Sequence, residues 1–152
     1  MPLNDLLAAQ AVLPALKAKN KKQALQELAA HAALLCGGKE REIFETLLHR
    51  ERLGSTGIGH GVAIPHGKLA RLDHLIGLFA RVDKPIDFES LDGEPVDLIF
   101  LLLAPEGAGA DHLKALARIA RILRDEKIAG ELRAARDETA LRALLTSPAA
   151  AA

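Results

Sequence analysis

A glycine-rich segment at residues 54–68, GSTGIGHGVAIPHGK, limits what this chain can fold into more than any other feature. Its first eight residues include four glycines, at positions 54, 57, 59 and 61. Glycine loses the most backbone entropy on ordering and adds no side chain to a core, so such a segment is costly as scaffold alone. Within it, His66 stands between Pro65, which restricts the backbone, and Gly67, which allows close approach. We expect a segment of this kind to present an imidazole ring to a partner.

The glycine spacing does not match the common nucleotide-binding motifs. Residue 62 is valine and the glycines precede a predicted strand, whereas the dinucleotide fingerprint follows a strand and opens a helix. Lys68 follows a single glycine, so the segment is not a phosphate-binding P-loop. The serine of the segment, Ser55, does not lie in the G-x-S-x-G elbow of serine hydrolases. From glycine content alone, a tight irregular turn is an equal alternative.

Hydrophobic periodicity predicts helices and strands on both sides of this segment. Helical spacing indicates a short opening helix near residues 4–7 and further helices near residues 21–36, 39–52, 110–124, 126–135 and 138–145. Extended apolar runs indicate strands at residues 12–16, 62–65, 75–82 and 96–103. The last strand is apolar nearly throughout and is expected at the centre of a sheet, whereas Pro14 places the first at an edge. The sequence therefore predicts one layered α/β domain over residues 1–146, with a disordered tail at residues 147–152.

Two of the predicted helices carry detail at the level of single residues. Asn20 is the expected N-cap of the helix that follows it, with Gln23 at the third helical position as in a capping box. Gly37 and Gly38 are expected to end that helix. In the helix near residues 110–124, the residues expected to face the core are Leu113, Leu116, Ala117, Ala120 and Leu123.

Composition restricts the class of partner. Lys and Arg total 20, Asp and Glu also total 20, and the chain has four Phe but no Trp or Tyr. A net charge of zero and so few aromatic residues argue against binding to nucleic acid or to a charged membrane surface. Cys36 is the only cysteine, which excludes an internal disulfide and favours a reducing, cytoplasmic compartment. We find no signal peptide, and the longest apolar run, residues 98–104, is shorter than the roughly 20 residues that span a bilayer.

Three residues are candidates for a site that binds or transfers an anionic group. His66 could act as a nucleophile if a backbone carbonyl fixes its other ring nitrogen. His112 lies in the first turn of a predicted helix, where free N–H groups attract anions. Arg50 precedes the glycines and could clamp a phosphate with its guanidinium group. The plainer alternatives are a surface-loop histidine, a solvent-facing helix residue and an arginine that complements a helix C-terminus.

The other histidines do not indicate a metal centre. No two of the six histidines have H-x-x-x-H spacing, and Cys36, although five residues from His31, is at least 13 residues from the other five histidines. His31 and His49 fall on predicted helices and are expected to face solvent, as is His74, whereas His60 could line the edge of a site.

Three segments resemble the enzyme IIA proteins of the bacterial phosphotransferase system. The segments are residues 50–68, 87–100 and 110–117, and the resemblance as a whole extends from residue 6 to residue 145. It is strongest to the nitrogen-regulatory branch within the fructose/mannitol class. The resemblance implies a single α/β domain with a mixed β-sheet sandwiched between helices. His60 departs from the pattern, because Asn is commoner at its position.

The resemblance also implies a role for each candidate residue. His66 would be the phosphorylated histidine, His112 the second active-site histidine that contacts the phosphoryl group, and Arg50 an aid to phosphate binding. The donor would be a histidine-phosphorylated carrier protein, the nitrogen-branch homologue of HPr, supplied from phosphoenolpyruvate through an enzyme I. Neither a metal nor another cofactor is implied. Regulatory targets in this branch include potassium transport or sensor proteins.

Two alternative functions remain open at the level of sequence. The chain could be a sugar-specific enzyme IIA that passes phosphate to a IIB component during fructose or mannitol uptake. It could also be an interaction module in which His66 is never phosphorylated. For the leading hypothesis, a regulatory phosphocarrier, a small apolar patch around the site should contact the carrier, with Ile58, Ile64 and Leu69 as candidates. Of these, Ile64 is expected to pack in the core instead.

Overall fold

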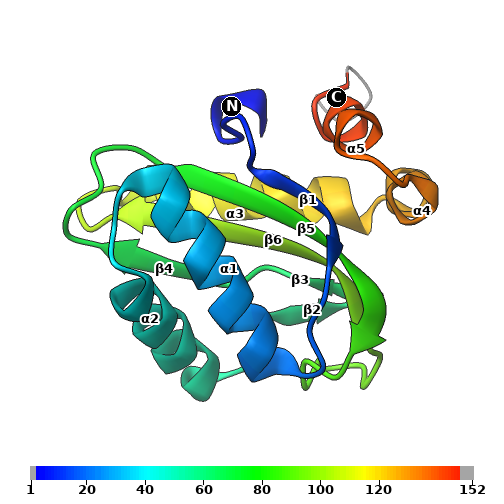
Figure 1. Ribbon diagram of the computed structural model, residues 1–152, viewed down its shortest axis with the longest axis horizontal. Helices are drawn as coiled ribbons and strands as arrows, with labels where there is room; N and C mark the ends of the chain where they lie inside the picture. Colours follow the sequence, from blue (N-terminus) through cyan, green and yellow to red (C-terminus); the bar gives the residue numbers. More distant parts are fainter. Residues whose placement is uncertain (1–2, 148–152) are drawn as a thin grey trace.

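Strand β6 (Val96–Pro105) is the centre of the sheet, as its apolar sequence predicts (Figure 1). The computed structural model describes residues 3–147. Strand β6 pairs antiparallel with β5 (Ile76–Ile86) and parallel with both β3 (Val62–Ala63) and β4 (His66–Leu69). Most of its side chains are fully buried, since helices cover both faces of the sheet. The sheet is therefore mixed, which confirms the predicted fold class.

The outer strands complete the order β1-β5-β6-β3-β2. Strand β4 pairs with β6 along the same edge as β3, but closer to the C-terminal end of β6. Strand β1 (Val12–Leu16) pairs with β5 on one side and with no other strand among the described residues. Its edge position is the one predicted from Pro14, which cannot donate a ladder hydrogen bond. At the other edge, β2 (Gly57–Gly59) pairs antiparallel with β3.

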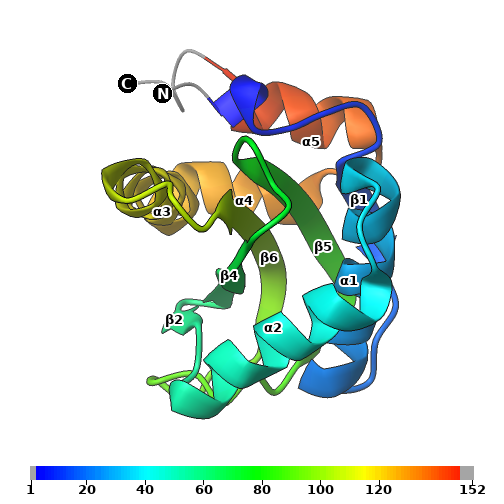
Figure 2. The same cartoon turned by 90° about the vertical axis from the view of Figure 1, so that its left-hand side faces the viewer.

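Helices lie on both faces of the sheet (Figure 2). On one face, α1 (Lys21–Cys36) packs against α2 (Glu40–Leu53), and α2 also contacts β4. On the other face, α3 (Ala110–Arg124) and α4 (Glu126–Ala134) pack against β6, and α5 (Glu138–Leu145) reaches β1. A short 3-10 helix, Leu3–Asp5, precedes β1 in place of the predicted opening helix. Figure 2 shows β4 between α2 and α3, which places the start of this strand between two helix layers.

The predicted ends of helix α1 are confirmed. The side chain of Asn20 accepts a hydrogen bond from the Gln23 N–H at 2.9 Å, as expected for an N-cap. Gln23 Oε1 in turn accepts from the N–H of Lys19, one residue before the cap, at 2.9 Å. Gly37 ends the helix with a φ of 69°, a left-handed conformation that glycine adopts without strain. These local signals fix the helix before any tertiary contact is considered.

The predicted inner face of helix α3 is wrong at two positions, Leu113 and Ala117, both of which are exposed. Leu113 is 67% exposed, although it was expected to face the core. The buried residues of the helix are instead His112, Ala115, Ile119, Ile122 and Leu123. Because His112 takes the inward position in the first turn, its neighbour points to solvent. Apolar periodicity does not anticipate a polar residue on the inner face of an amphipathic helix. A buried histidine at such a position indicates a functional site.

The glycine-rich segment contains more strand than the sequence predicts. A single strand was expected at residues 62–65, but β3 covers only Val62–Ala63 and a new strand, β4, begins at His66. Residues 57–59 also form a strand. Apolar patterning could not reveal β2 or β4, because both are built largely from glycine and polar residues. The predicted tail at 147–152 falls, beyond Ser147, outside the described residues, so the domain boundary at 146 stays a prediction.

Candidate functional site

His66 is the first residue of strand β4 and is half-buried. It pairs with Leu102 of β6, and the Leu102 N–H donates to the carbonyl of the preceding Pro65 at 3.0 Å. The backbone at His66 is therefore held by the centre of the sheet. Gly67 follows, and its missing side chain lets α2 approach β4 closely: a Cβ built there would lie 2.6 Å from Thr46 Cγ2. The pairing of β4 with β6 fixes the ring beside helix α2.

The imidazole of His66 is held at both nitrogens. Its Nδ1 lies 2.8 Å from the Ile64 carbonyl oxygen, which can only accept, so Nδ1 carries the hydrogen. Its Nε2 accepts from the Nε of Arg50 at 3.3 Å. Both contacts require the same neutral tautomer, with the lone pair on Nε2. This is the state of a ring that is ready to attack through Nε2.

Arg50 reaches His66 from the last turn of helix α2. Its Nη1 donates to the Gly54 carbonyl oxygen at 2.8 Å, which ties the guanidinium to the start of the glycine-rich segment. The group therefore lies across the edge of the ring at which a phosphoryl group would bind. A planar guanidinium at this place can donate two hydrogen bonds to phosphoryl oxygens once it leaves Nε2.

His112 completes the cluster from the N-terminal turn of helix α3. Its ring centroid lies 5.6 Å from that of His66, with an angle of 60° between the ring planes. The residue is only 6% exposed. Its buried Nδ1 has no hydrogen-bond partner among residues 3–147. The structure thus brings together the three residues singled out from the sequence, from α2, β4 and α3.

Both histidines are held in the neutral form. Burial lowers the pKa of His66 below its usual 6.5, and the Arg50 guanidinium lowers it further. The Ile64 carbonyl and the carboxylate of Glu51 act in the opposite direction but do not outweigh these effects. Burial also lowers the pKa of His112, with smaller contributions from His66 and Lys68. At neutral pH the site therefore offers an uncharged nucleophile, as phosphoryl acceptance by imidazole requires.

The lowered pKa values predict that the free energy of unfolding falls in mild acid. In the unfolded chain the two histidines titrate near 6.5, whereas the folded protein protonates them only at lower pH. The unfolded state therefore binds more protons just below about pH 6.5, so this stability is fully present above that pH and declines below it. Urea denaturation between about pH 7.5 and about pH 5.5 should reveal the decline, and His112→Asn should reduce it. A free energy that stays constant over this range would contradict the neutral, buried pair.

The sequence analysis missed one residue beside the site. Glu51 follows Arg50 on helix α2 and is only 7% exposed, and it contacts Thr56 and Lys21. Nothing in the local sequence distinguishes it from the other charged residues of that helix end. Its burial depends on helix α1, which supplies Lys21 from 30 positions away. Only the packing of α1 on α2 could have indicated this residue.

The predicted apolar contact residues are only partly correct. Ile64 is buried in the core, as expected for it, and Leu69 is also buried and cannot meet a partner, whereas Ile58 stays partly exposed. The exposed leucines near the site in sequence are instead Leu53, 74% exposed at the end of α2, and Leu113, 67% exposed beside His112. Leu69 ends strand β4, which the sequence did not predict, so its burial could not be foreseen.

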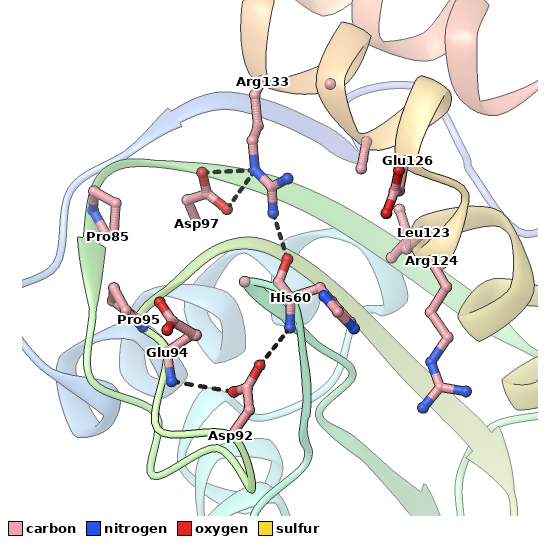
Figure 3. A pocket seen from close by; sticks show the side chains of 13 residues that line it. His60, Pro85, Asp92, Glu94, Pro95, Asp97, Leu123, Arg124, Glu126 and Arg133 are labelled. Atoms are coloured by element: carbon pink, nitrogen blue, oxygen red, sulfur yellow. Dashed lines mark hydrogen bonds and ion pairs between the residues drawn. The ribbon is translucent and has the colours of Figure 1, made fainter.

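His60 lies at a separate cavity of about 730 Å³, whose lining includes none of Arg50, His66 and His112 (Figure 3). Its φ is 56°, a left-handed conformation that Asn adopts more readily than most residues. The Asn that the resemblance implies would therefore fit this turn. The His60 N–H donates to Asp92 at 2.9 Å, and Arg133 donates to the His60 carbonyl at 2.7 Å. These contacts hold the turn between β2 and β3 rather than forming the site.

Metal and membrane features give no further candidates within residues 3–147. No group of three or more His, Cys, Asp or Glu side chains is placed to hold a metal ion in that part of the chain. None of its helices is both long enough and apolar enough to cross a bilayer.

Comparisons with known proteins identify the family to which this arrangement belongs. Residues 5–147 match the family described as phosphoenolpyruvate-dependent sugar phosphotransferase system, EIIA 2. The chain belongs to this enzyme IIA family. A nitrogen regulatory protein of Bradyrhizobium diazoefficiens is 67% identical over 152 residues, which is 100% of this chain and 99% of the relative. This similarity places the chain in the nitrogen-regulatory branch, as the resemblance predicted.

Solved structures agree with this assignment. The nitrogen regulatory protein IIA-Ntr of Neisseria meningitidis has a TM-score of 0.90 at 35% identity, covering 95% of this chain and 99% of that chain. The mannitol IIA of Escherichia coli has a TM-score of 0.77 at 22% identity, over 91% of this enzyme IIA and 98% of its own chain, and shows the same fold. Family membership makes the chain a component of a phosphoryl-transfer system.

Proposed function

We propose that this enzyme IIA accepts a phosphoryl group on Nε2 of His66 from a histidine-phosphorylated carrier protein, the nitrogen-branch homologue of HPr. The proposal depends on one observation: the Ile64 carbonyl holds the hydrogen on Nδ1 and leaves the lone pair on Nε2, next to Arg50. A surface histidine without a function would not need a fixed tautomer and a lowered pKa together.

The reaction exchanges one N–P bond for another. The lone pair on His66 Nε2 attacks phosphorus in line with the leaving group and forms the new N–P bond. The old N–P bond breaks, and its electron pair returns to the ring nitrogen of the donor histidine. Charge spreads over three equatorial oxygens in the transition state, so positioned donors contribute more than covalent chemistry. Arg50 moves from Nε2 to these oxygens, and His112, whose ring centroid lies 5.6 Å from that of His66, contacts them as well.

The exposed leucines give the carrier a surface to bind. Leu53 follows Arg50 by one helical turn, and Leu113 is the neighbour of His112. Exposed leucines close to charged site residues are typical of small, transient interfaces, which a carrier that must leave after each transfer requires.

The phosphorylation state would then control binding to regulatory partners, among them potassium transport or sensor proteins. A phosphoryl group places about two negative charges at a site that now presents a neutral imidazole and an arginine, which changes the surface offered to a partner. The 67% identity to a nitrogen regulatory protein favours this role over transfer to a sugar-specific IIB component. An interaction module without phosphorylation would leave the fixed tautomer of His66 unexplained.

A labelling experiment tests the proposal. The protein is incubated with phosphorylated carrier, and the modified residue and ring nitrogen are located by mass spectrometry and by 15N NMR. We expect one phosphoryl group, on Nε2 of His66. Label on another residue, or on Nδ1, would contradict the proposal, as would an absence of label with a carrier that phosphorylates other members of the family.

A further inference from the structure

A buried carboxylate lies directly behind the site. Glu51 Oε1 accepts a hydrogen bond from the Thr56 N–H at 3.1 Å. It also forms an ion pair with Lys21 Nζ at 2.9 Å. Its second oxygen accepts from the Thr56 hydroxyl. Lys21 comes from helix α1 and also lies 5.2 Å from the centre of the Phe88 ring. A glutamate is rarely buried unless it is paired in this way, because its charge loses the stabilisation of water.

Thr56 connects this carboxylate to the backbone that orients His66. The Thr56 carbonyl oxygen accepts from the Ile64 N–H at 3.0 Å. The Ile64 carbonyl oxygen in turn accepts from His66 Nδ1 at 2.8 Å. The carboxylate of Glu51 and the imidazole of His66 are therefore the two ends of one series of hydrogen bonds, which runs through the peptide groups of residues 56 and 64.

Glu51 also fixes the start of the glycine-rich segment. Arg50, its neighbour on helix α2, donates to the Gly54 carbonyl, while Glu51 receives the Thr56 N–H two residues further on. Two adjacent side chains thus hold both sides of a short loop. Without the carboxylate, the Thr56 N–H and hydroxyl would lose their acceptor in a buried place, and the loop could move with the Ile64 carbonyl.

We infer that Glu51 is a positioning residue for the acceptor histidine: it holds the Ile64 carbonyl in place through Thr56 and so keeps the hydrogen of His66 on Nδ1. This inference rests on the proposed phosphoryl transfer to His66, although its first readout does not. Glu51 touches no reacting atom. It acts by geometry and by charge, and the two effects can be separated by substitution.

The charge of Glu51 has a distinct signature. The groups that face His66 are Arg50 and Glu51 from α2 and His112 from α3, with Lys68 facing His112. Among the charged side chains, Arg50 lowers the pKa of His66 and Glu51 raises it. Glu51→Gln removes the negative charge but keeps an oxygen that can accept from the Thr56 N–H. The pKa of His66 should then fall further, so the pH profile of phosphoryl acceptance moves to lower pH.

Glu51→Ala removes both the charge and the acceptor. The 15N chemical shifts of His66 should change from a single Nδ1–H tautomer to a mixture of the two tautomers. The initial rate of phosphoryl acceptance should fall by between about tenfold and about a hundredfold, because Nε2 is then protonated or misplaced in part of the molecules. Glu51→Gln should keep the single tautomer and most of the rate at its own optimum pH.

Glu89→Gln is the matched control. Glu89 is the other carboxylate that meets Lys21, at 3.4 Å, but its side chain is 75% exposed. Loss of the Glu89 charge should leave the tautomer of His66 unchanged and the initial rate of phosphoryl acceptance within about twofold of the wild type. The reason is that exposed ion pairs contribute little to the free energy of folding. Circular dichroism of each variant establishes that it is folded.

The outcomes separate the inference from the proposed function. If His66 in the Glu51→Ala protein keeps the single tautomer of the wild type, the inference is overturned, whether or not the rate of phosphoryl acceptance falls. If Glu51→Ala does not fold, the test is the pH profile of phosphoryl acceptance by Glu51→Gln. A profile shifted to lower pH than in the wild type supports the inference, and an unshifted profile overturns it. If the wild type accepts no phosphoryl group, the proposed function fails, and the tautomer of the folded variants still tests the role of Glu51.

Discussion

His66→Ala is expected to abolish uptake of the phosphoryl group completely. No other histidine has the same environment: His112 is buried with its Nδ1 unpartnered, and His49 is exposed on helix α2. Alanine also removes the ring that Arg50 contacts, so the guanidinium would keep only its bond to Gly54. Incubation with phosphorylated carrier, followed by the mass of the intact protein, should show one added phosphoryl group in the wild type and none in the variant.

His49→Ala is the control for this experiment. It removes a histidine from the same region of the chain, but one that lines no part of the cluster, and it should accept phosphate as the wild type does. Residual phosphorylation of His66→Ala at the wild-type rate would mean that a different residue is the acceptor. Because the His66 side chain is only half-buried, its loss should cost little stability, and the two variants should unfold at similar urea concentrations.

The parts of this fold that sequence predicts well are those decided locally. The Asn20 cap, the Gly37 terminus and the apolar strand β6 each depend on contacts within a few residues or on burial from both sides. The cluster of Arg50, His66 and His112 is not decided locally, because it requires β4 to lie parallel to β6. This pairing places the end of β6 beside the end of β4, and helix α3 then begins at Ala110, with His112 within 5.6 Å of His66 between ring centroids. Only the resemblance to enzyme IIA proteins anticipated that arrangement.

The residues that sequence reasoning misplaced share a physical cause. Leu113 and Leu69 are apolar: spacing placed Leu113 in the core, where it is exposed, and Leu69 at an interface, where it is buried. Their fates depend on a shift of one position: His112 takes the inward place on α3, and the break at Pro65 separates two short strands. A shift of one residue turns a strand side chain to the opposite face and a helix side chain by about 100°. Tertiary contacts of the polar site residues decide that shift.

Gly67→Ala should destabilise the protein and slow phosphoryl transfer together. A Cβ at this position would lie 2.6 Å from Thr46 Cγ2 on helix α2, closer than two carbon atoms can approach. Gly67 is held in the ladder with β6 opposite Leu103, so the strand cannot move away. Helix α2 must shift instead, and it carries Arg50. We expect a loss of about 1–3 kcal/mol in the free energy of unfolding, measured with urea, and a lower transfer rate.

Thr46→Ser should restore much of both properties in the Gly67→Ala protein. Serine lacks Cγ2, while its hydroxyl can keep the bond that Thr46 Oγ1 donates to the Glu42 carbonyl at 2.8 Å. The next contact of the added Cβ, Thr46 Cβ at 3.8 Å, is an ordinary one. Gly130→Ala is the control, because nothing lies within 4 Å of its added Cβ, and it should stabilise helix α4 by about 0.5–1 kcal/mol. If Thr46→Ser recovers neither stability nor rate, then contact between α2 and β4 is not the reason that glycine follows the acceptor histidine.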